Sequence, residues 1–288
     1  MPVERVRLAA HAMATRFEIV VDGDPVRMRA AAEEAIREVH RVEQQLSWFV
    51  PESVVSRINQ RAAQQPVKVP ARIYELLQLA QSLHQASGGA FDPTVAPDSS
   101  ESPAGMDSVV LEDRTVRFTS PQTLLNLGAI GKGYALDLAA EIMLEAGARN
   151  ALLHGGTSTA VALGSDGVRP WTIGVSHPVP DRAGELIARM PLVNACLSVS
   201  GIYNRGQQTD DGWKGHIMDP RSGKAVSHTE LAAAVTYRGN LAAARADALS
   251  TALLVTGTRG PAFEDTHTLC YSQNRITEHS GPWQLAGG

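Results

Sequence analysis

The chain has 288 residues, a length that at about 150 residues per domain predicts one large domain or two modest ones with a sizeable core. Apolar residues make up 43% of the sequence and charged residues 19%, a balance that excludes disorder of the whole chain. Its 26 Lys and Arg stand against 30 Asp and Glu, and the formal net charge of -4 does not favour nucleic acid or an anionic membrane as a partner.

No run of about 18 apolar residues occurs, which excludes a transmembrane helix. The first residues contain neither the apolar run of a signal peptide nor an early cysteine for a lipid anchor. We therefore expect a soluble chain that is cytoplasmic as written, or periplasmic if an export signal has been removed. Cys196 and Cys270 lie outside any Cys-x-x-Cys pair, which predicts two core residues and neither a disulfide framework nor a zinc site.

The first half of the chain alternates one strand with long helices. Alternation of apolar and polar residues predicts a strand over 16–21, and apolar residues at helical spacing predict helices over 26–46 and 71–86. Mirrored apolar residues around the polar turn at 112–114 predict a hairpin over 108–118.

The second half is richer in strands. A helix is predicted over 131–145, ended by Gly147, and another over 241–255. Short apolar runs divided by Gly, Pro, Asp and Asn predict strands over 151–153, 159–163, 171–175, 186–193, 195–199, 231–237 and 268–272. Because helices and strands do not alternate strictly, we expect an α+β fold of antiparallel sheets packed with helices, forming one two-lobed unit over 1–288.

A glycine-rich turn precedes the helix predicted from residue 131. Its sequence, Gly128-Ala129-Ile130-Gly131-Lys132-Gly133, places free backbone amides and a lysine at the positive end of a helix. That arrangement suits a phosphate group, although the spacing matches neither a Walker loop nor a dinucleotide fingerprint. From spacing alone, a purely structural turn is an equal alternative.

A second candidate site lies on the helix predicted over 241–255. Asp247 and Thr251 are one turn apart, so a carboxylate and a hydroxyl oxygen face one side together and suit a hard cation such as Mg²⁺. The alternative is a solvated face or a local hydrogen bond. The apolar neighbours of Asp247 predict a buried helix, in which an idle carboxylate is costly, and this favours the cation site.

Three further motifs are weaker. In the segment 87–94, Phe91 offers a stacking surface and Asp92 an acceptor, against the simpler alternative of a helix cap and turn. In 215–223, His216 is a candidate proton acceptor, whereas Asp219 would cap the turn that follows. The pair Gly155-Gly156 allows a close backbone approach, and a tight turn between strands is its simpler explanation.

Together, the order of these motifs resembles the FAD:protein FMN transferase family, also called the ApbE family. The resemblance covers most of the chain, through 13–15, 53–59, 89–94, 128–137, 155–156, 216–223 and 246–257. It implies an α+β enzyme that binds FAD and Mg²⁺ and transfers FMN to a Ser or Thr hydroxyl of an acceptor flavoprotein, with AMP leaving.

The resemblance also implies roles for single residues. The implied FAD contacts are Met13, Phe49, Ala90, Phe91, Asp92, Lys132, His216 and Ile217. The implied metal ligands are Asp247, Thr251 and the backbone carbonyl of Ala129. His216 is our candidate base for the acceptor hydroxyl and Asp92 the alternative, since spacing does not choose between them.

The sequence also departs from the family pattern. The stretch between Val95 and Ser108 is shorter than usual and lacks the Pro-Leu and Trp-Gly pairs, and Asn126 stands where Asp is frequent. Two alternatives to the transferase follow. Water in place of the acceptor would make the protein an FAD pyrophosphatase, and loss of part of the site would leave a flavin-binding protein without activity.

Overall fold

A computed structural model describes residues 4–94, 105–182, 184–203, 207–209, 212–214 and 217–286. In this part of the chain the α-helices are α1 (Pro25–Leu46), α2 (Val54–Arg61), α3 (Ala71–Ala86), α4 (Gly131–Glu145) and α5 (Ala242–Thr256). Short 3-10 turns are η1 (Met106–Ser108), η2 (Leu127–Ala129), η3 (Pro180–Arg182) and η4 (Pro261–Phe263).

One large antiparallel sheet organises the molecule. Its strands, in spatial order, are β1 (Glu4–Ala12), β2 (Thr15–Gly23), β6 (Asn150–Gly155), β7 (Thr159–Leu163), β10 (Ala195–Gly201), β15 (Leu231–Tyr237), β16 (His267–Ser272) and β17 (Arg275–Ser280). The N-terminal hairpin β1–β2 pairs with β6, so the beginning of the chain is tied to its middle. This confirms the expected α+β class with antiparallel pairing.

Smaller sheets flank the large one. A three-stranded sheet joins β8 (Trp171–Ser176), β9 (Leu186–Leu192) and β18 (Gln284–Leu285), and another joins β3 (Val67–Lys68), β4 (Val109–Glu112) and β5 (Thr115–Phe118). Two short ribbons are β11 (Gln207–Thr209) with β12 (Gly212–Lys214), and β13 (Met218–Asp219) with β14 (Lys224–Ala225).

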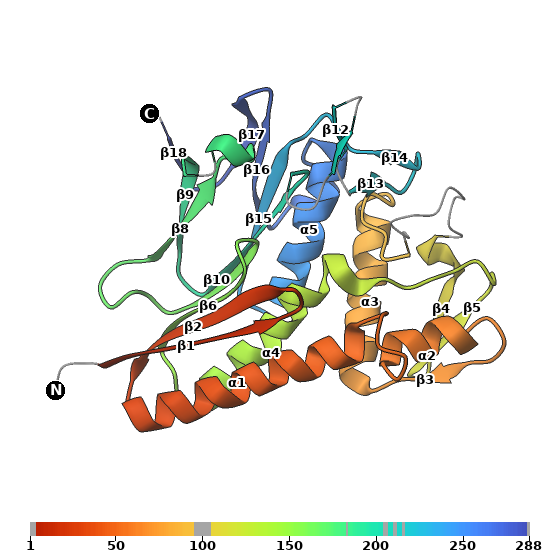
Figure 1. The fold of residues 1–288 in the computed structure, drawn as a ribbon, viewed down its shortest axis with the longest axis horizontal. Helices are drawn as coiled ribbons and strands as arrows, with labels where there is room; N and C mark the ends of the chain where they lie inside the picture. The colour runs from red at the N-terminus through yellow and green to blue at the C-terminus, as the bar shows by residue number, and fades with distance from the viewer. Residues whose placement is uncertain are drawn as a thin grey trace.

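The large sheet is covered on both faces, so its strands alternate between two cores. Phe17 and Ile19 of β2 face the helices, whereas Val20 belongs to a second cluster with Trp171 and Met190 of the sheet β8–β9–β18. Figure 1 shows α1, α4 and α5 stacked along one side of the sheet and β8, β9 and β18 on the other. Burial on both faces explains why β15 reads as a continuous apolar run.

The helices predicted over 26–46, 71–86, 131–145 and 241–255 are confirmed to within one residue at each end. The helix α2 was not predicted, although Ser53 caps it by accepting a hydrogen bond from the Ser56 backbone N–H at 2.9 Å. The outer strands β1 and β17 were also missed, because their apolar faces are only partly buried and carry a weak pattern.

The hairpin over 108–118 is present as β4 and β5, with a shorter turn than predicted. Only Asp113 and Arg114 connect the strands, and their φ angles of 44° and 58° are those of a two-residue type I′ turn. Aspartate tolerates this left-handed conformation better than most residues, which accounts for its place at the first turn position.

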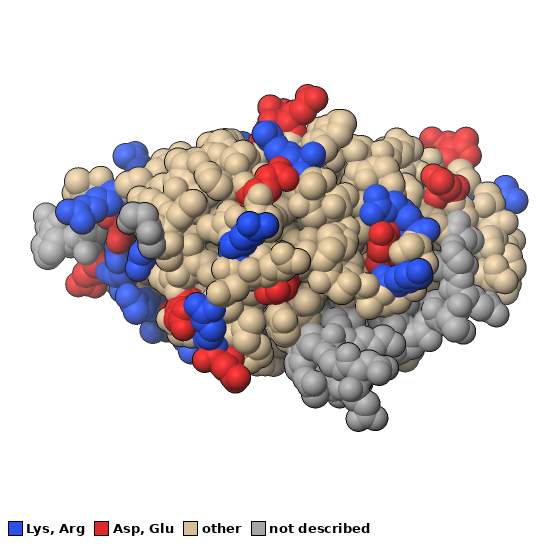
Figure 2. Space-filling model, turned by 90° about the horizontal axis from the view of Figure 1, so that it is seen from above, with Lys and Arg blue, Asp and Glu red and all other residues tan. Residues whose placement is uncertain are grey.

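On the described surface, positive and negative side chains are mixed (Figure 2), as the similar numbers of basic and acidic residues in the sequence suggest. Figure 2 shows Lys and Arg interspersed with Asp and Glu over the face seen from above. None of the helices that the structure describes has both the length and the hydropathy to cross a bilayer.

Candidate functional site

The candidate site forms where the first turns of α4 and α5 pack against each other. Gly133, the third residue of α4, lies directly on the Ala243 carbonyl and the Ala244 nitrogen of α5, and a Cβ atom at position 133 would overlap both. Glycine is therefore required here for close packing and not for an unusual φ angle. This contact brings Lys132 and Asp247 together from positions 115 residues apart.

Each helix donates backbone N–H groups from its first turn to a carboxylate on the other. Asp247 of α5 accepts from the Gly133 N–H at 3.1 Å. Asp137 of α4 accepts from the N–H groups of Ala243 and Ala244 at 2.9 Å each. Because the first amides of a helix have no partner within it, the two carboxylates satisfy groups that burial would otherwise leave unpaired.

Asp137 was not identified from the sequence. Its surroundings explain why the pKa of its carboxyl is raised. Burial raises the pKa of this carboxyl to about 7, against the lowering effect of its two backbone hydrogen bonds. The negative charges of Glu141 and Asp247 act in the same direction as burial. Asp137 is therefore a structural carboxyl whose charge depends on pH near neutrality.

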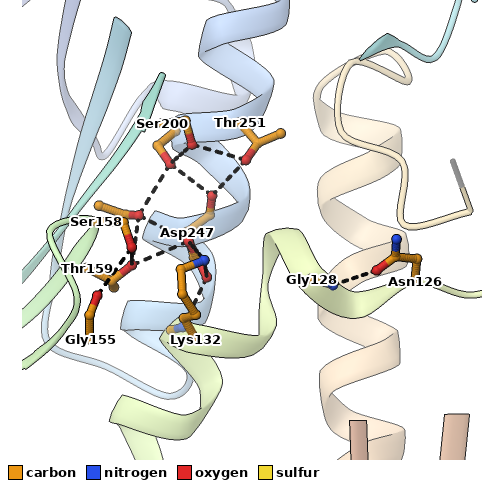
Figure 3. A network of polar contacts seen from close by, with 12 residues as sticks. Asn126, Gly128, Lys132, Gly155, Ser158, Thr159, Ser200, Asp247 and Thr251 are labelled. Atoms are coloured by element: carbon orange, nitrogen blue, oxygen red, sulfur yellow. Dashed lines mark hydrogen bonds and ion pairs between the residues drawn. The ribbon is translucent and has the colours of Figure 1, made fainter. Parts of the chain in front are cut away.

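Hydroxyl groups surround the carboxylate of Asp247, whose side chain is only 4% exposed. Its Oδ1 accepts from Ser198 Oγ at 3.2 Å and from Thr159 Oγ1 at 3.4 Å. Ser200, which Figure 3 labels, extends the network, and its Oγ lies 2.8 Å from Ser250 Oγ. The buried helix predicted around Asp247 is thus confirmed, and its carboxylate is held in place by strands β7 and β10.

Lys132 extends over this carboxylate (Figure 3). Its Nζ lies 3.4 Å from both Oδ1 and Oδ2 of Asp247, and its side chain is 21% exposed. Lys132 therefore lies between the buried carboxylate and the surface, at the start of the helix where a phosphate site was one of two alternatives from the sequence.

Thr251 lies beside Asp247 as the helical spacing predicts. Its Oγ1 donates to the Asp247 backbone carbonyl at 3.3 Å and lies 3.2 Å from Ser200 Oγ. The turn η2, which ends at the half-buried Ala129, packs against α5. Carboxylate, hydroxyl and carbonyl oxygens are the donors of a hard cation, and among the described residues no group of three His, Cys, Asp or Glu points to a softer metal. The chemistry of these donors suits Mg²⁺, and their role as its ligands stays a prediction.

Asn126, one of the departures from the family pattern, has a defined local role. Its Oδ1 accepts from the Gly128 N–H at 3.0 Å and caps η2, the turn that precedes α4 (Figure 3). The amide oxygen of Asn performs this capping as a carboxylate would. The substitution therefore preserves the turn that carries Ala129 and Lys132.

The hairpin β1–β2 ends beside the Gly155-Gly156 pair. At its tip Met13 has a φ of 49°, and its N–H donates to Glu43 Oε1 of α1 at 2.6 Å. A Cβ at Gly156 would overlap Thr15, and one at Gly155 would lie 2.9 Å from the Phe17 ring. The glycine pair therefore allows the close approach of β2, and the half-buried Met13 is held in a strained conformation.

The segment after α3 is built around Asp92. Its Oδ1 accepts from the N–H and hydroxyl of Thr94 at 2.8 and 2.6 Å, and its Oδ2 accepts from the Met106 N–H at 3.2 Å. Ala90 and Phe91 are 1% exposed and lie in the core, so the ring of Phe91 offers no exposed stacking surface in this structure. Flavin contact by 90–92 stays a prediction.

The other implied FAD contacts occupy different environments. Phe49 is 81% exposed and meets Trp48 edge to face, so its ring is free to contact a ligand. Ile217 is half-buried. His216 lies outside the described residues, as does most of the shortened segment between 95 and 108. Their predicted roles remain predictions.

A comparison with models of known protein families identifies the family of this chain. The model of the ApbE family matches residues 13–269, well over half of the sequence. The chain belongs to the ApbE family. A relative from Vibrio cholerae named FAD:protein FMN transferase is 25% identical over 281 residues, which cover 89% of this chain and 83% of the relative.

Solved structures of ApbE proteins have the same fold. The crystal structure of the ApbE protein from Thermotoga maritima matches with a TM-score of 0.82 at 26% identity, over 93% of this chain and 94% of that one. The flavin transferase ApbE from Vibrio cholerae matches with a TM-score of 0.80 at 21% identity, over 97% and 98% of the two chains. The second likeness supports the ApbE fold.

Several residues around Asp247 were not predicted. Ser198 and Ser200 stand two apart on β10, so they face the same side, toward α5. Hydroxyls repeated at this spacing within an otherwise apolar strand are the signal that could have identified them. Asp137 carries no comparable signal, because its partners are backbone groups of a helix that begins 105 residues later.

Proposed function

We propose that this chain transfers FMN from FAD to a Ser or Thr hydroxyl of an acceptor flavoprotein, with Mg²⁺ bound and AMP released. The observation that carries the proposal is that Lys132, in the first turn of α4, lies against Asp247 of α5, with Thr251 one turn further along α5. A lysine that suits a phosphate and oxygens that suit a cation thus lie close together. Relatives of the chain are named FAD:protein FMN transferase, and transfer of FMN from FAD is a reaction that uses a phosphate site next to a cation site.

Lys132 and the N–H groups at the beginning of α4 would bind the pyrophosphate of FAD, since a helix start favours anions. Asp247, Thr251 and the Ala129 carbonyl would hold Mg²⁺. When bound, Mg²⁺ supplies positive charge that stabilises the charge developing on the transferring phosphoryl group. The exposed ring of Phe49 would contact the flavin.

The transfer exchanges the phosphoanhydride bond of FAD for a phosphate ester bond to the acceptor. The oxygen of the acceptor hydroxyl forms a bond to the FMN phosphorus, and the bond from that phosphorus to the bridging oxygen breaks. AMP leaves with the bridging oxygen and its electron pair. Lys132 would stay close to the phosphate oxygens during this exchange and stabilise their charge.

The hydroxyl proton requires an acceptor at the site. Both oxygens of Asp92 accept hydrogen bonds within their own loop, and its side chain is 5% exposed. This arrangement favours His216 over Asp92 as the base, because an imidazole takes up a proton near neutral pH. The pair His216→Asn and Asp92→Asn would separate the two, since only loss of the base should remove a titration from the pH–rate profile.

The deciding experiment incubates the protein with FAD, Mg²⁺ and a peptide that carries a flavinylation Thr. AMP release and peptide mass are followed together, with the Thr→Val peptide as the control. AMP together with an FMN-sized mass gain on the Thr peptide alone supports the transferase. AMP without an adduct identifies the FAD pyrophosphatase, and flavin binding without AMP identifies a non-catalytic flavin-binding protein.

A further inference from the structure

The ammonium group of Lys132 contacts the carboxylate of Asp247, the same group that would bind the cation. We propose that Lys132 and the divalent cation compete for Asp247, so that the cation site is complete only after Lys132 has moved to the phosphates of the flavin substrate. The inference rests on the proposed function, which supplies the phosphates and the cation. It concerns the order and the coupling of their binding.

Asp247 is already fully engaged by donors in this structure. Oδ2 accepts from the Gly133 N–H at 3.1 Å, Oδ1 accepts from Ser198 at 3.2 Å and from Thr159 at 3.4 Å, and Lys132 Nζ lies 3.4 Å from both oxygens. A cation therefore reaches this carboxylate only by replacing a donor. The side chain of Asp247 is 4% exposed, so solvent offers no second route to its oxygens.

The donors differ in their freedom to leave. The Gly133 N–H belongs to a helix packed against Ala243, and Ser198 and Thr159 are buried on strands β10 and β7. Lys132 instead has a flexible four-carbon stem, is 21% exposed and begins at the first turn of α4. Among the described donors, Lys132 is therefore the group that a cation displaces.

Charge makes the two occupants exclude each other. An ammonium and a divalent cation on one buried carboxylate repel strongly, because the surroundings screen charge less than water does. A pyrophosphate beside α4 removes this conflict, since it attracts the ammonium and supplies oxygens to the cation. Phosphate-bearing substrate and cation should therefore strengthen each other's binding, and the coupling is reciprocal.

The test measures binding of Mn²⁺, a paramagnetic substitute for Mg²⁺, by electron paramagnetic resonance without any flavin. Lys132→Met removes the ammonium and keeps the stem, so we expect Mn²⁺ to bind roughly fivefold or more tightly than to the wild-type protein, a common size for coupled sites. Lys132→Arg retains the charge and should stay near the wild-type affinity. Lys68→Met, at an exposed lysine on β3, is the matched control and should not change it.

Equal or weaker Mn²⁺ binding by Lys132→Met, in a variant whose circular dichroism shows it to be folded, overturns the proposal. A gain that persists when Asp247→Asn is added also overturns it, because the released site would then lie elsewhere. The titration contains neither FAD nor acceptor, so its result is independent of transfer. Tighter Mn²⁺ binding with no AMP release in the peptide assay would reject the transferase and keep the competition at Asp247.

Discussion

Asp247 connects more of the candidate site than any other side chain discussed above. A single carboxylate accepts from a backbone amide, from Ser198 and Thr159, and from Lys132. These donors come from α4, β7 and β10, so one residue both joins these elements and presents the oxygens that suit a cation. Substitution at this position should therefore change binding and stability together.

Asp247→Asn should abolish FMN transfer and lower the melting temperature. The variant keeps the size of the side chain, but it removes the charge and turns an NH₂ group toward groups that themselves donate. AMP release and thermal unfolding measure the two effects. Asp113→Asn, in the exposed hairpin turn, is the matched control, and wild-type turnover by Asp247→Asn would contradict the cation assignment.

The sequence predicted part of this site because some of its geometry is local. Asp247 and Thr251 share a face through helical spacing, and Lys132 begins a helix after a glycine-rich turn. The contact between Lys132 and Asp247 depends on how α4 crosses α5, which no local pattern contains. Likewise, Phe91 looked like a ligand surface, but tertiary packing placed its ring in the core.

At the scale of elements, the crossing of α4 and α5 depends on the absence of a side chain at position 133. Gly133→Ala should lower the free energy of unfolding by about 1–3 kcal/mol, because its Cβ would overlap the backbone of α5 and push the helices apart. Urea unfolding measures this change. Gly131→Ala is the matched control, since its Cβ would lie 3.4 Å from Leu46 Cδ1, and an equal loss in both variants would contradict the packing argument.

The cap that α4 provides for α5 should depend on pH. Burial raises the pKa of Asp137 from 3.8 to about 7, so between these values the folded protein binds a proton that the unfolded chain has released. The free energy of unfolding should therefore fall as pH rises from about 4 to about 7 and level off above it.

Denaturant unfolding of the wild-type protein and Asp137→Asn across this range isolates the effect. The amide does not titrate, so the stability advantage of the wild-type protein over the variant should shrink as pH rises. A constant difference between the two proteins would show that Asp137 keeps an ordinary pKa in the fold.

Helices and strands were predicted more accurately the longer and more regular their apolar periodicity was. The helices α1, α3, α4 and α5 have long periodic sequences, and the predicted ranges agree with the structure. The helix α2 buries Val54, Val55 and Ile58 but has only eight residues, and the strand β1 lies at the edge of the sheet with most of its residues exposed or half-buried. Their signals were too weak to separate from those of loops.

At the scale of the whole molecule, two cores share one sheet, and the candidate site belongs to the helical side. Trp171 lies in the other core, where it is 6% exposed and its Nε1 donates to the Leu163 carbonyl at 3.2 Å. Trp171→Ala should lower the free energy of unfolding by about 3–5 kcal/mol through loss of packing. At a temperature where the variant is folded, its Mn²⁺ affinity should equal that of the wild-type protein, and a changed affinity would show coupling across the sheet.

The order of strands was not predictable from the sequence. Pairing of β2 with β6 joins residues that lie more than a hundred positions apart, and single-strand patterns do not specify such partners. The class of the fold followed from the succession of elements, whereas the order β7–β10–β15 required the structure. A single two-lobed unit over 1–288 stays a prediction, as does any effect of the shortened segment 95–108.

Each of the helices α4 and α5 caps the beginning of the other with a carboxylate, and this reciprocal capping affects how the protein unfolds locally. The amide protons of Gly133, Ala243 and Ala244 are each held by an acid on the opposite helix. If the first turn of either helix frays, its N–H groups lose their hydrogen bonds to the carboxylate on the other helix. Under native conditions these three amides should therefore exchange with deuterium at one common rate, and the two helices should open in a single event.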